Sequence, residues 1–350
     1  MQVFLCYTLA RGGPGLVADA AWEMRAMRGR VAKVLMVLAA GASAVVLLLY
    51  WAEGSLHPKR STRRLWQATR EAGKPWWRFL DGYIYARWPL GYIGSAIGER
   101  GELRWLRPLF APFLLTLLRP RRWANGYHGK VMPTESVKRL VSIHEDIDLT
   151  IPEQVIPFRS ARDLILSQPH RIVVLDCPCR AAREHPCKPV DVCLIVGEPF
   201  ASFVLEHSPR NARSITSDEA VQILEAEARR GHVHHAFFKE AMLDRFYAIC
   251  NCCSCCCGAI QAQRHGTPML ISSGYTSRVD LQRCMECGAC VAACPFGAVS
   301  LNGHLAIDVA TCMGCGVCVS TCRHDALALV RDERKPAPLE VPISATYGGD

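Results

Sequence analysis

Hydrophobic positions near the N-terminus of this chain gather in one uninterrupted stretch. Residues 34–51 read VLMVLAAGASAVVLLLYW, without a charged side chain. This length reaches the lower limit for a helix that crosses a bilayer, and Tyr50 and Trp51 end it with aromatic residues that favour a membrane interface. A signal peptide or a buried core helix would also be apolar, but no small-residue cleavage site follows. We therefore expect an uncleaved transmembrane helix at 34–51, preceded by an N-terminal segment at 1–33.

Basic side chains flank this apolar stretch on both sides. Those before it are Arg25, Arg28, Arg30 and Lys33, and those after it are Lys59, Arg60, Arg63, Arg64 and Arg70. The positive-inside rule gives the C-terminal side a slight preference for the cytoplasm. We interpret residues 52–131, rich in Trp, Tyr, Arg, Pro and Gly, as a basic and aromatic membrane-proximal region. Its short apolar segments either lie in the interface or pack as core helices.

From residue 132 the pattern changes to short strands alternating with short helices. The apolar runs at 171–175 (RIVVL), 193–196 (CLIV) and 245–249 (RFYAI) predict three buried strands. This pattern predicts a small cysteine-rich α/β (α+β) domain over 132–274.

Two capping signals predict helices within this domain. Thr216 and Glu219 form a capping box for a helix that Gly231 ends. Ser160 and Asp163 form a second box, which predicts a short helix ending near residue 168.

Composition changes this picture, because the chain of 350 residues holds 19 cysteines. Their dense spacing is typical of metal ligands and not of a disulfide scaffold. The formal net charge is +9, which alone would suit nucleic acid or an anionic membrane surface. The neighbouring apolar stretch favours the membrane. We therefore expect a membrane as a partner, and no nucleic acid.

An internal duplication occupies the C-terminal part of the chain. Cys284-x-x-Cys287-x-x-Cys290-x-x-x-Cys294 recurs as Cys312-x-x-Cys315-x-x-Cys318-x-x-x-Cys322. Three thiolates at this spacing reach three corners of one iron–sulfur cube, and the fourth serves the other cube. Cluster I would use Cys284, Cys287, Cys290 and Cys322, and cluster II would use Cys312, Cys315, Cys318 and Cys294. Zinc also binds Cys-x-x-Cys pairs, but two complete runs in tandem disfavour it.

Over about residues 275–330 the chain resembles bacterial dicluster ferredoxins, on the strength of these two runs. The resemblance implies two low-potential [4Fe–4S] clusters close enough for fast electron exchange. It also implies a ferredoxin-like α+β domain, which we place at 275–332, followed by a C-terminal tail at 333–350. Arg323 stands where the family usually has a proline after the last cysteine, which leaves the ligand set intact.

Ten further cysteines form two groups outside the duplication. They are Cys177, Cys179, Cys187 and Cys193 in the first group, and Cys250, Cys252, Cys253, Cys255, Cys256 and Cys257 in the second. Each group follows a predicted strand. If these strands are parallel neighbours, both groups lie at one edge of the sheet, where ligands bind in open α/β folds.

These ten thiols exceed the four that one cubane needs. Free thiols at this density oxidise readily, so we expect at least four of them to bind one or more additional iron–sulfur clusters. The plainer reading is that several are small buried residues. Adjacent pairs such as Cys252-Cys253 are similar to those of CCG-type domains of heterodisulfide reductases, which hold non-cubane clusters, but the CCG spacing is absent.

Polar residues near these groups are weaker candidates. His232 and His234 would share one face of a strand and could bind a metal or carry protons, although a strand end exposed to water is the expectation. Arg180 and Arg183 flank the first group and are expected to be solvated. No glycine-rich nucleotide loop is present, so electrons should come from a protein partner.

Two functions of different classes follow. The first is a membrane-anchored iron–sulfur electron-transfer protein with a single membrane pass and cytoplasmic cluster domains. It would relay single electrons between redox protein partners, through two [4Fe–4S] clusters to or from a further cluster in the cysteine-rich domain. The alternative is an iron–sulfur reductase whose extra cluster, at the Cys177 and Cys250 groups, reduces a small molecule or a disulfide. A third candidate is a maturation factor that delivers clusters to another complex.

Overall fold

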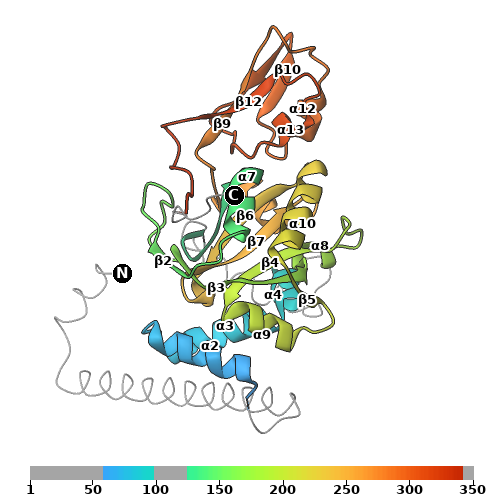
Figure 1. The fold of residues 1–350 in the computed structure, drawn as a ribbon. Helices are drawn as coiled ribbons and strands as arrows, with labels where there is room; N and C mark the ends of the chain where they lie inside the picture. The colour runs from blue at the N-terminus through green and yellow to red at the C-terminus, as the bar shows by residue number, and fades with distance from the viewer. Residues whose placement is uncertain (1–57, 98–123, 342–350) are drawn as a thin grey trace, which may run out of the picture. The chain divides into compact units, whose positions relative to one another are not determined.

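The computed structural model describes residues 58–97 and 124–341 (Figure 1). The predicted N-terminal segment 1–33 and the predicted transmembrane helix 34–51 lie outside these residues. In the described part of the chain, no helix is both long and apolar enough to cross a bilayer.

A mixed sheet of eight strands organises the larger part of the fold. Its strand order is β2-β3-β4-β7-β6-β1-β8, and β5 pairs with β3 off this path. The strands are β1 (Tyr127–Met132), β2 (Ile147–Thr150), β3 (Asp163–Asp176), β4 (Asp191–Glu198), β5 (Ala212–Ile215), β6 (Val233–Lys239), β7 (Arg245–Cys252) and β8 (Leu270–Ile271). The three strands predicted at 171–175, 193–196 and 245–249 are confirmed as parts of β3, β4 and β7.

Both faces of this sheet are buried. In β3, Val173 and Leu175 belong to one hydrophobic core and Ile172 and Val174 to another on the opposite face. A strand covered on both sides gains from apolar side chains at consecutive positions. This is why the run at 171–175 is continuously hydrophobic and does not alternate.

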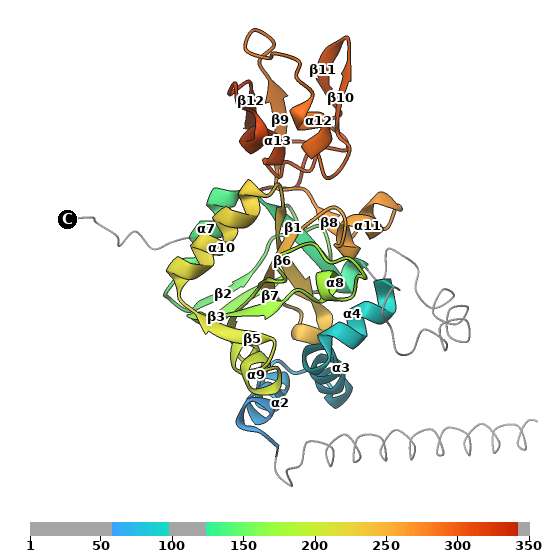
Figure 2. The same ribbon diagram turned by 90° about the vertical axis from the view of Figure 1, so that its right-hand side faces the viewer.

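Helices cover the two faces separately, as Figure 2 shows. On one face lie α7 (Thr134–Val141) and α10 (Ser217–Arg229). On the other face lie α2 (Arg60–Glu71), α3 (Trp76–Arg87), α4 (Pro89–Ile97), α8 (Pro178–Ala181), α9 (Phe200–His207) and α11 (Gly258–Arg264), and the short η2 (Glu240–Met242) connects β6 to β7. The predicted cap of α10 is confirmed, since the backbone N–H of Glu219 donates to Oγ1 of Thr216 at 3.1 Å.

The helix predicted after Ser160 is wrong, because residues 163–168 begin β3. Asp163 pairs with Thr150 of β2, and the Ser160 hydroxyl accepts from Nδ2 of Asn125 at 3.0 Å. Leu164 and Leu166 are fully buried at alternate positions. Burial of alternate side chains in a strand outweighs the local capping preference, and Asn125 provides the hydrogen-bond partner of the Ser160 hydroxyl.

The ferredoxin-like lobe is built from two small antiparallel ribbons and two short helices. β9 (Tyr275–Val279) pairs with β12 (Leu327–Arg331), and β10 (Val299–Asn302) pairs with β11 (His304–Ile307). The helices are α12 (Ala289–Ala293) and α13 (Val317–Thr321). The described fold is therefore mixed α/β with a ferredoxin-type lobe.

The larger core draws on chain beyond 132–274. Leu65 of α2 and Tyr85 of α3 are buried in one of its two cores, and Leu339 is buried in the other. β1 begins at Tyr127 inside the sheet. The described helices of the region we interpreted as membrane-proximal thus pack as core helices, because their apolar stripes cover a face of the sheet.

Candidate metal centres

Two small cavities in the ferredoxin-like lobe are each surrounded by four cysteines. One is lined by Cys284, Cys287, Cys290 and Cys322, and the other by Cys294, Cys312, Cys315 and Cys318. The structure therefore brings together the two quartets predicted from the duplication, with the last cysteine of each run in the cavity of the other.

The backbone around the two quartets is nearly symmetric. Gly288 and Gly316 adopt left-handed φ values of 74° and 85° and begin α12 and α13. After each run an amide donates to a sulfur: Ala298 N lies 3.3 Å from Cys294 Sγ, and Ala326 N lies 3.4 Å from Cys322 Sγ. Such donors stabilise negative charge on a ligand sulfur.

Burial raises the pKa of the Cys315 thiol to about 12 and also raises the pKa of Cys290 and Cys318. These thiols are protonated at neutral pH without metal, and metal binding must release their protons. Amide donors and four thiols around each cavity fit one [4Fe–4S] cluster in each quartet.

The ten other cysteines meet at the edge where β3 and β7 end. The sequence-based expectation of parallel neighbours is wrong for most of their length, because β4 lies between them and pairs antiparallel with both. β3 and β7 nevertheless run in the same direction and share one parallel pair, Asp163 with Arg245. Their carboxyl ends and the amino end of β4 therefore lie at the same edge, and this brings the two cysteine groups together.

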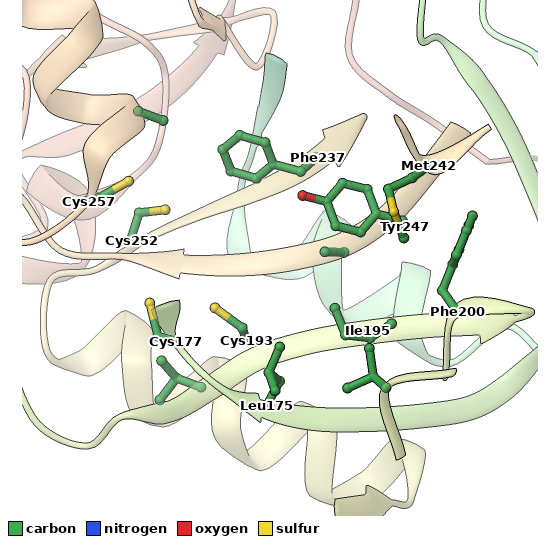
Figure 3. Close-up of a cluster of buried hydrophobic side chains, with 14 of the residues drawn as sticks. Leu175, Cys177, Cys193, Ile195, Phe200, Phe237, Met242, Tyr247, Cys252 and Cys257 are labelled. Atoms are coloured by element: carbon green, nitrogen blue, oxygen red, sulfur yellow. The ribbon is translucent and has the colours of Figure 1, made fainter. Parts of the chain in front are cut away.

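Six of these thiols form a closed ring, which we call the six-thiol ring. Its sulfurs contact one another in the order Cys177, Cys179, Cys257, Cys252, Cys250, Cys193 and back to Cys177. They come from the segment after β3, from β4, from the end of β7 and from the start of α11. Figure 3 shows four of them, with Cys177 and Cys193 facing Cys252 and Cys257.

Hydrogen bonds among the ring thiols lower the pKa of some of them and raise the pKa of others. Cys250 has a pKa lowered to about 6 by hydrogen bonds from Cys193 and Cys252, and Cys257 has a pKa lowered to about 5 by hydrogen bonds from Cys179 and Cys252. The donor thiol of Cys177 has its pKa raised to about 12. Cys250 and Cys257 thus favour the thiolate, which is the form that binds metal, whereas the pKa of each of the other four ring thiols is raised.

The other four thiols form a separate group, the four-thiol cluster of Cys187, Cys253, Cys255 and Cys256. The sulfurs of Cys187, Cys253 and Cys255 all lie within 4.8 Å of one another. Cys256 Sγ lies 3.6 Å from Cys255 Sγ. The spatial division therefore differs from the two groups of the sequence, because Cys187 joins three cysteines of the second group.

A buried ionic network lies beside both groups of thiols. The Arg180 side chain is 1% exposed, and its Nη2 donates to Oε2 of Glu227 at 2.5 Å. Hydrogen bonds from His232 and Arg180 outweigh the effect of burial and lower the pKa of Glu227. Arg183 is also buried and donates to the carbonyl oxygen of Cys256 at 3.1 Å. The expectation of solvated arginines is wrong.

The expected water-exposed strand end is also wrong for the two histidines. His234 is buried, and its Nδ1 lies 2.6 Å from Oδ1 of Asn251. His232 is 9% exposed, and its Nε2 lies 3.7 Å from Cys187 Sγ. The pKa of His234 is lowered to about 4 by burial, so this ring is neutral near pH 7.

The six-thiol ring borders a cavity of about 330 Å³. Apolar side chains such as Ile93, Ile195 and Phe237 line most of it. Four tyrosines also line it, Tyr85, Tyr92, Tyr127 and Tyr247. The hydroxyl of Tyr85 lies 2.6 Å from that of Tyr247 and 3.4 Å from that of Tyr127. Sequence reasoning missed them, because the four lie in separate segments and form no motif.

Comparison with known proteins finds a match for the ferredoxin-like lobe alone. A family model described as a 4Fe-4S dicluster domain matches residues 283–326. No curated protein matches the chain. The match and the two cysteine quartets together indicate two [4Fe–4S] clusters and an iron–sulfur protein.

Proposed function

We propose that the chain is a membrane-anchored iron–sulfur electron-transfer protein, which relays single electrons between its two [4Fe–4S] clusters and a further cluster in the six-thiol ring. The observation that carries this proposal is the convergence of six thiols from four segments at one edge of the sheet. One-electron transfer is the chemistry that such clusters supply. The chain contributes ligand sulfurs, their spacing and their burial.

The width of the ring favours a polynuclear cluster. Each sulfur contacts its two neighbours, yet within residues 58–97 and 124–341 no three ring sulfurs gather within 4.8 Å. A single tetrahedral ion with bonds of about 2.3 Å needs a tighter group. Six sulfurs around a wider opening suit several metal atoms bridged by sulfide.

Contacts between the lobe and the larger domain support the relay. Met313 and Val317 of the lobe are buried in the core that contains ring cysteines. Helix α11 starts beside Cys257 and ends at Arg264, whose Nε donates to the carbonyl oxygen of Pro295 at 3.1 Å. Pro295 follows the ligand Cys294. A helix of this length spans about 10 Å, so α11 and the Arg264 side chain connect the six-thiol ring to the backbone beside a ferredoxin ligand.

Exposed aromatic and basic side chains support membrane attachment. Trp66, Trp76 and Trp77 are 38%, 64% and 47% exposed, and Arg63 and Arg64 of α2 are exposed beside them. Tryptophan and arginine together favour the interface of an anionic bilayer. These helices follow the predicted span at 34–51 in the chain.

Membrane attachment is tested by washing isolated membranes that contain the full chain. High salt and then alkaline carbonate should leave the protein in the membrane pellet, because a spanning helix does not depend on charge. Complete release by salt would contradict the anchor and leave only surface attachment.

The relay is tested by measuring iron and acid-labile sulfide in the full chain purified without oxygen. We expect more than about eight irons per chain, because two cubanes account for about eight. Cys250→Ala should lower iron and sulfide while the low-temperature EPR signals of the ferredoxin clusters remain. As the matched control, Cys287→Ala should alter the ferredoxin signals and leave the additional signal. About eight irons, unchanged by Cys250→Ala, would contradict an additional cluster.

The cavity favours one alternative, an iron–sulfur reductase. The cavity has a volume of about 330 Å³ and mostly apolar walls. It would bind a small apolar molecule or a disulfide beside the ring. Reduction of a disulfide takes two electrons, supplied by a redox protein partner, and two protons, which come from solvent. Burial raises the pKa of Tyr85 and Tyr247, so their hydroxyls would keep their protons and orient the substrate by donating hydrogen bonds. Tyr247→Phe would then lower turnover of an added disulfide and leave iron content unchanged. An electron carrier would show no turnover in either form.

A further inference from the structure

The four-thiol cluster contains sulfurs that lie closer together than those of any other cysteine group in the described part of the chain. Sulfurs of Cys187, Cys253 and Cys255 lie mutually within 4.8 Å. Cys256 Sγ lies 3.6 Å from Cys255 Sγ and also contacts the thiol of Cys253. Three sulfurs are therefore gathered around one small volume, and Cys256 Sγ borders it through its contacts with Cys253 and Cys255.

The spacing of Cys187, Cys253 and Cys255 matches a single tetrahedral ion, with Cys256 as the fourth ligand. With metal–sulfur bonds of about 2.3 Å, the sulfurs of a tetrahedral tetrathiolate site lie about 3.8 Å apart. In a cubane each ligand sulfur binds a different iron, so the ligand sulfurs lie farther apart. The ferredoxin quartets provide an internal comparison, because among the described residues none of their sulfur trios gathers within 4.8 Å.

Surrounding groups hold the four sulfurs in the manner of a metal site. The backbone N–H of Cys187 donates to Cys256 Sγ at 3.5 Å. His232 lies with Nε2 3.7 Å from Cys187 Sγ, and its Nδ1 lies 2.6 Å from Oε2 of Glu227. Glu227 thus orients an imidazole that contacts a ligand sulfur, and hydrogen-bonding groups around metal ligands commonly hold them in place.

Charge around the cluster also suits bound thiolates. Four thiolates with one divalent ion carry a net charge of about −2. Arg180 and Arg183 are both buried beside the cluster. Arg183 donates from Nη2 to Cys256 O at 3.1 Å, so its charge lies next to the loop that supplies three of the four sulfurs.

We propose that Cys187, Cys253, Cys255 and Cys256 bind one mononuclear tetrahedral metal ion, for which zinc is the fitting metal, as a centre separate from any cluster in the six-thiol ring. The ion joins two loops that carry ring cysteines. Cys253 to Cys256 lie between Cys252 and Cys257, and Cys187 lies between Cys179 and Cys193. Zn²⁺ has no redox chemistry, so this centre takes no part in electron transfer.

The test measures zinc, iron and acid-labile sulfide in the full chain purified without oxygen. We expect about one zinc per chain. Cys255→Ala should remove that zinc and leave iron and sulfide unchanged. Cys287→Ala is the matched control, since both thiols are exposed, and it should retain the zinc and lower the iron. Loss of iron and sulfide together in Cys255→Ala, or no zinc in the natural chain, would overturn the proposal.

Substitution with cobalt provides a second measurement, which does not depend on how much zinc the protein acquires during expression. Exchange of zinc for Co²⁺ should produce the intense near-ultraviolet charge-transfer band of tetrahedral cobalt thiolate. The band should be lost in Cys187→Ala and kept in Cys250→Ala. A band that is kept in Cys187→Ala, or lost only in Cys250→Ala, would contradict the assignment of ligands. The iron content could contradict the proposed relay and leave the proposed zinc centre intact, because the two proposals use different cysteines.

Discussion

At the scale of single residues, Arg180 shows how one buried charge joins several segments. Its Nη2 donates to Glu227 Oε2 at 2.5 Å and to the carbonyl oxygen of Asn251 at 2.9 Å. Burial opposes the charge of this guanidinium, but the hydrogen bond and the charge of Glu227 raise its pKa. The pair therefore links α10 to the end of β7, where the six-thiol ring begins.

Removal of the Glu227 charge should be costly. Glu227→Gln leaves Arg180 buried without a counter-charge, and breaking such a pair destabilises a protein by about 3–5 kcal/mol. The matched control is Glu225→Gln on the same helix, whose carboxylate pairs with Lys138 at 2.8 Å near solvent. A solvent-exposed pair of that kind contributes little to stability, so Glu225→Gln should leave the midpoint nearly unchanged.

Guanidinium denaturation of the oxygen-protected chain, followed by circular dichroism, measures both variants. Equal shifts of the midpoint in the two would contradict a stabilising role for the buried pair.

At the scale of elements, the Cys-x-x-Cys turns depend on positive φ angles. Gly314 has φ of 64°, and the equivalent position in the first copy is Glu286 with φ of 52°. A side chain is thus tolerated in this conformation where there is room. At Gly314 there is none, since an added Cβ would lie 2.2 Å from the carbonyl oxygen of Tyr275 and 2.4 Å from Oγ of Ser273.

Gly314→Ala should therefore displace the turn that carries Cys312 and Cys315. We expect a loss of about four irons per chain, because cluster II could not assemble. Gly303→Ala is the control, because this glycine has φ of 84° with nothing within 4 Å of the added Cβ. It should cost about 1–2 kcal/mol of backbone strain and retain all iron. Full iron content in Gly314→Ala would show that the close approach of β9 is not needed.

At the scale of the whole described chain, the C-terminal segment returns from the lobe to the larger domain. Ala337 N donates to the carbonyl oxygen of Gln154 at 2.5 Å, and Lys130 Nζ donates to the carbonyl oxygen of Ala337 at 2.7 Å. Leu339 is 5% exposed in the core below α7 and α10. The residues that we interpreted as a tail thus complete a core that begins elsewhere in the chain.

Leu339→Ala should destabilise the larger domain by about 2–5 kcal/mol, the usual range for a leucine removed from a core. Glu340→Ala, at the exposed neighbouring position, should have an effect within about 0.5 kcal/mol. Thermal unfolding of the two variants, followed by circular dichroism, tests this. Equal melting temperatures would show that the segment packs only loosely on the sheet.

Several features could be predicted from the sequence because they depend on nearby residues. The two ferredoxin quartets follow from spacing, since a tight turn presents three sulfurs regardless of the rest of the fold. The helix α10 follows from Thr216 and Glu219, and the strands of the sheet follow from short apolar runs. In each case the residues that decide the structure are close together in the chain.

Tertiary structure decided how the ten other cysteines divide and which polar groups are buried. Cys187 lies with Cys253 and Cys255 because β3 and β7 end, and β4 begins, at one edge of the sheet. Spacing along the chain does not show that these residues are neighbours. Arg180 and His232 are buried only because α10 covers the same edge. Ser160 begins no helix, since a distant Asn125 takes its hydrogen bond. Contacts between distant segments outweigh the local preferences that a sequence pattern records. The sequence pattern therefore identified the cysteine ligands, and the tertiary structure determined which cysteines lie together.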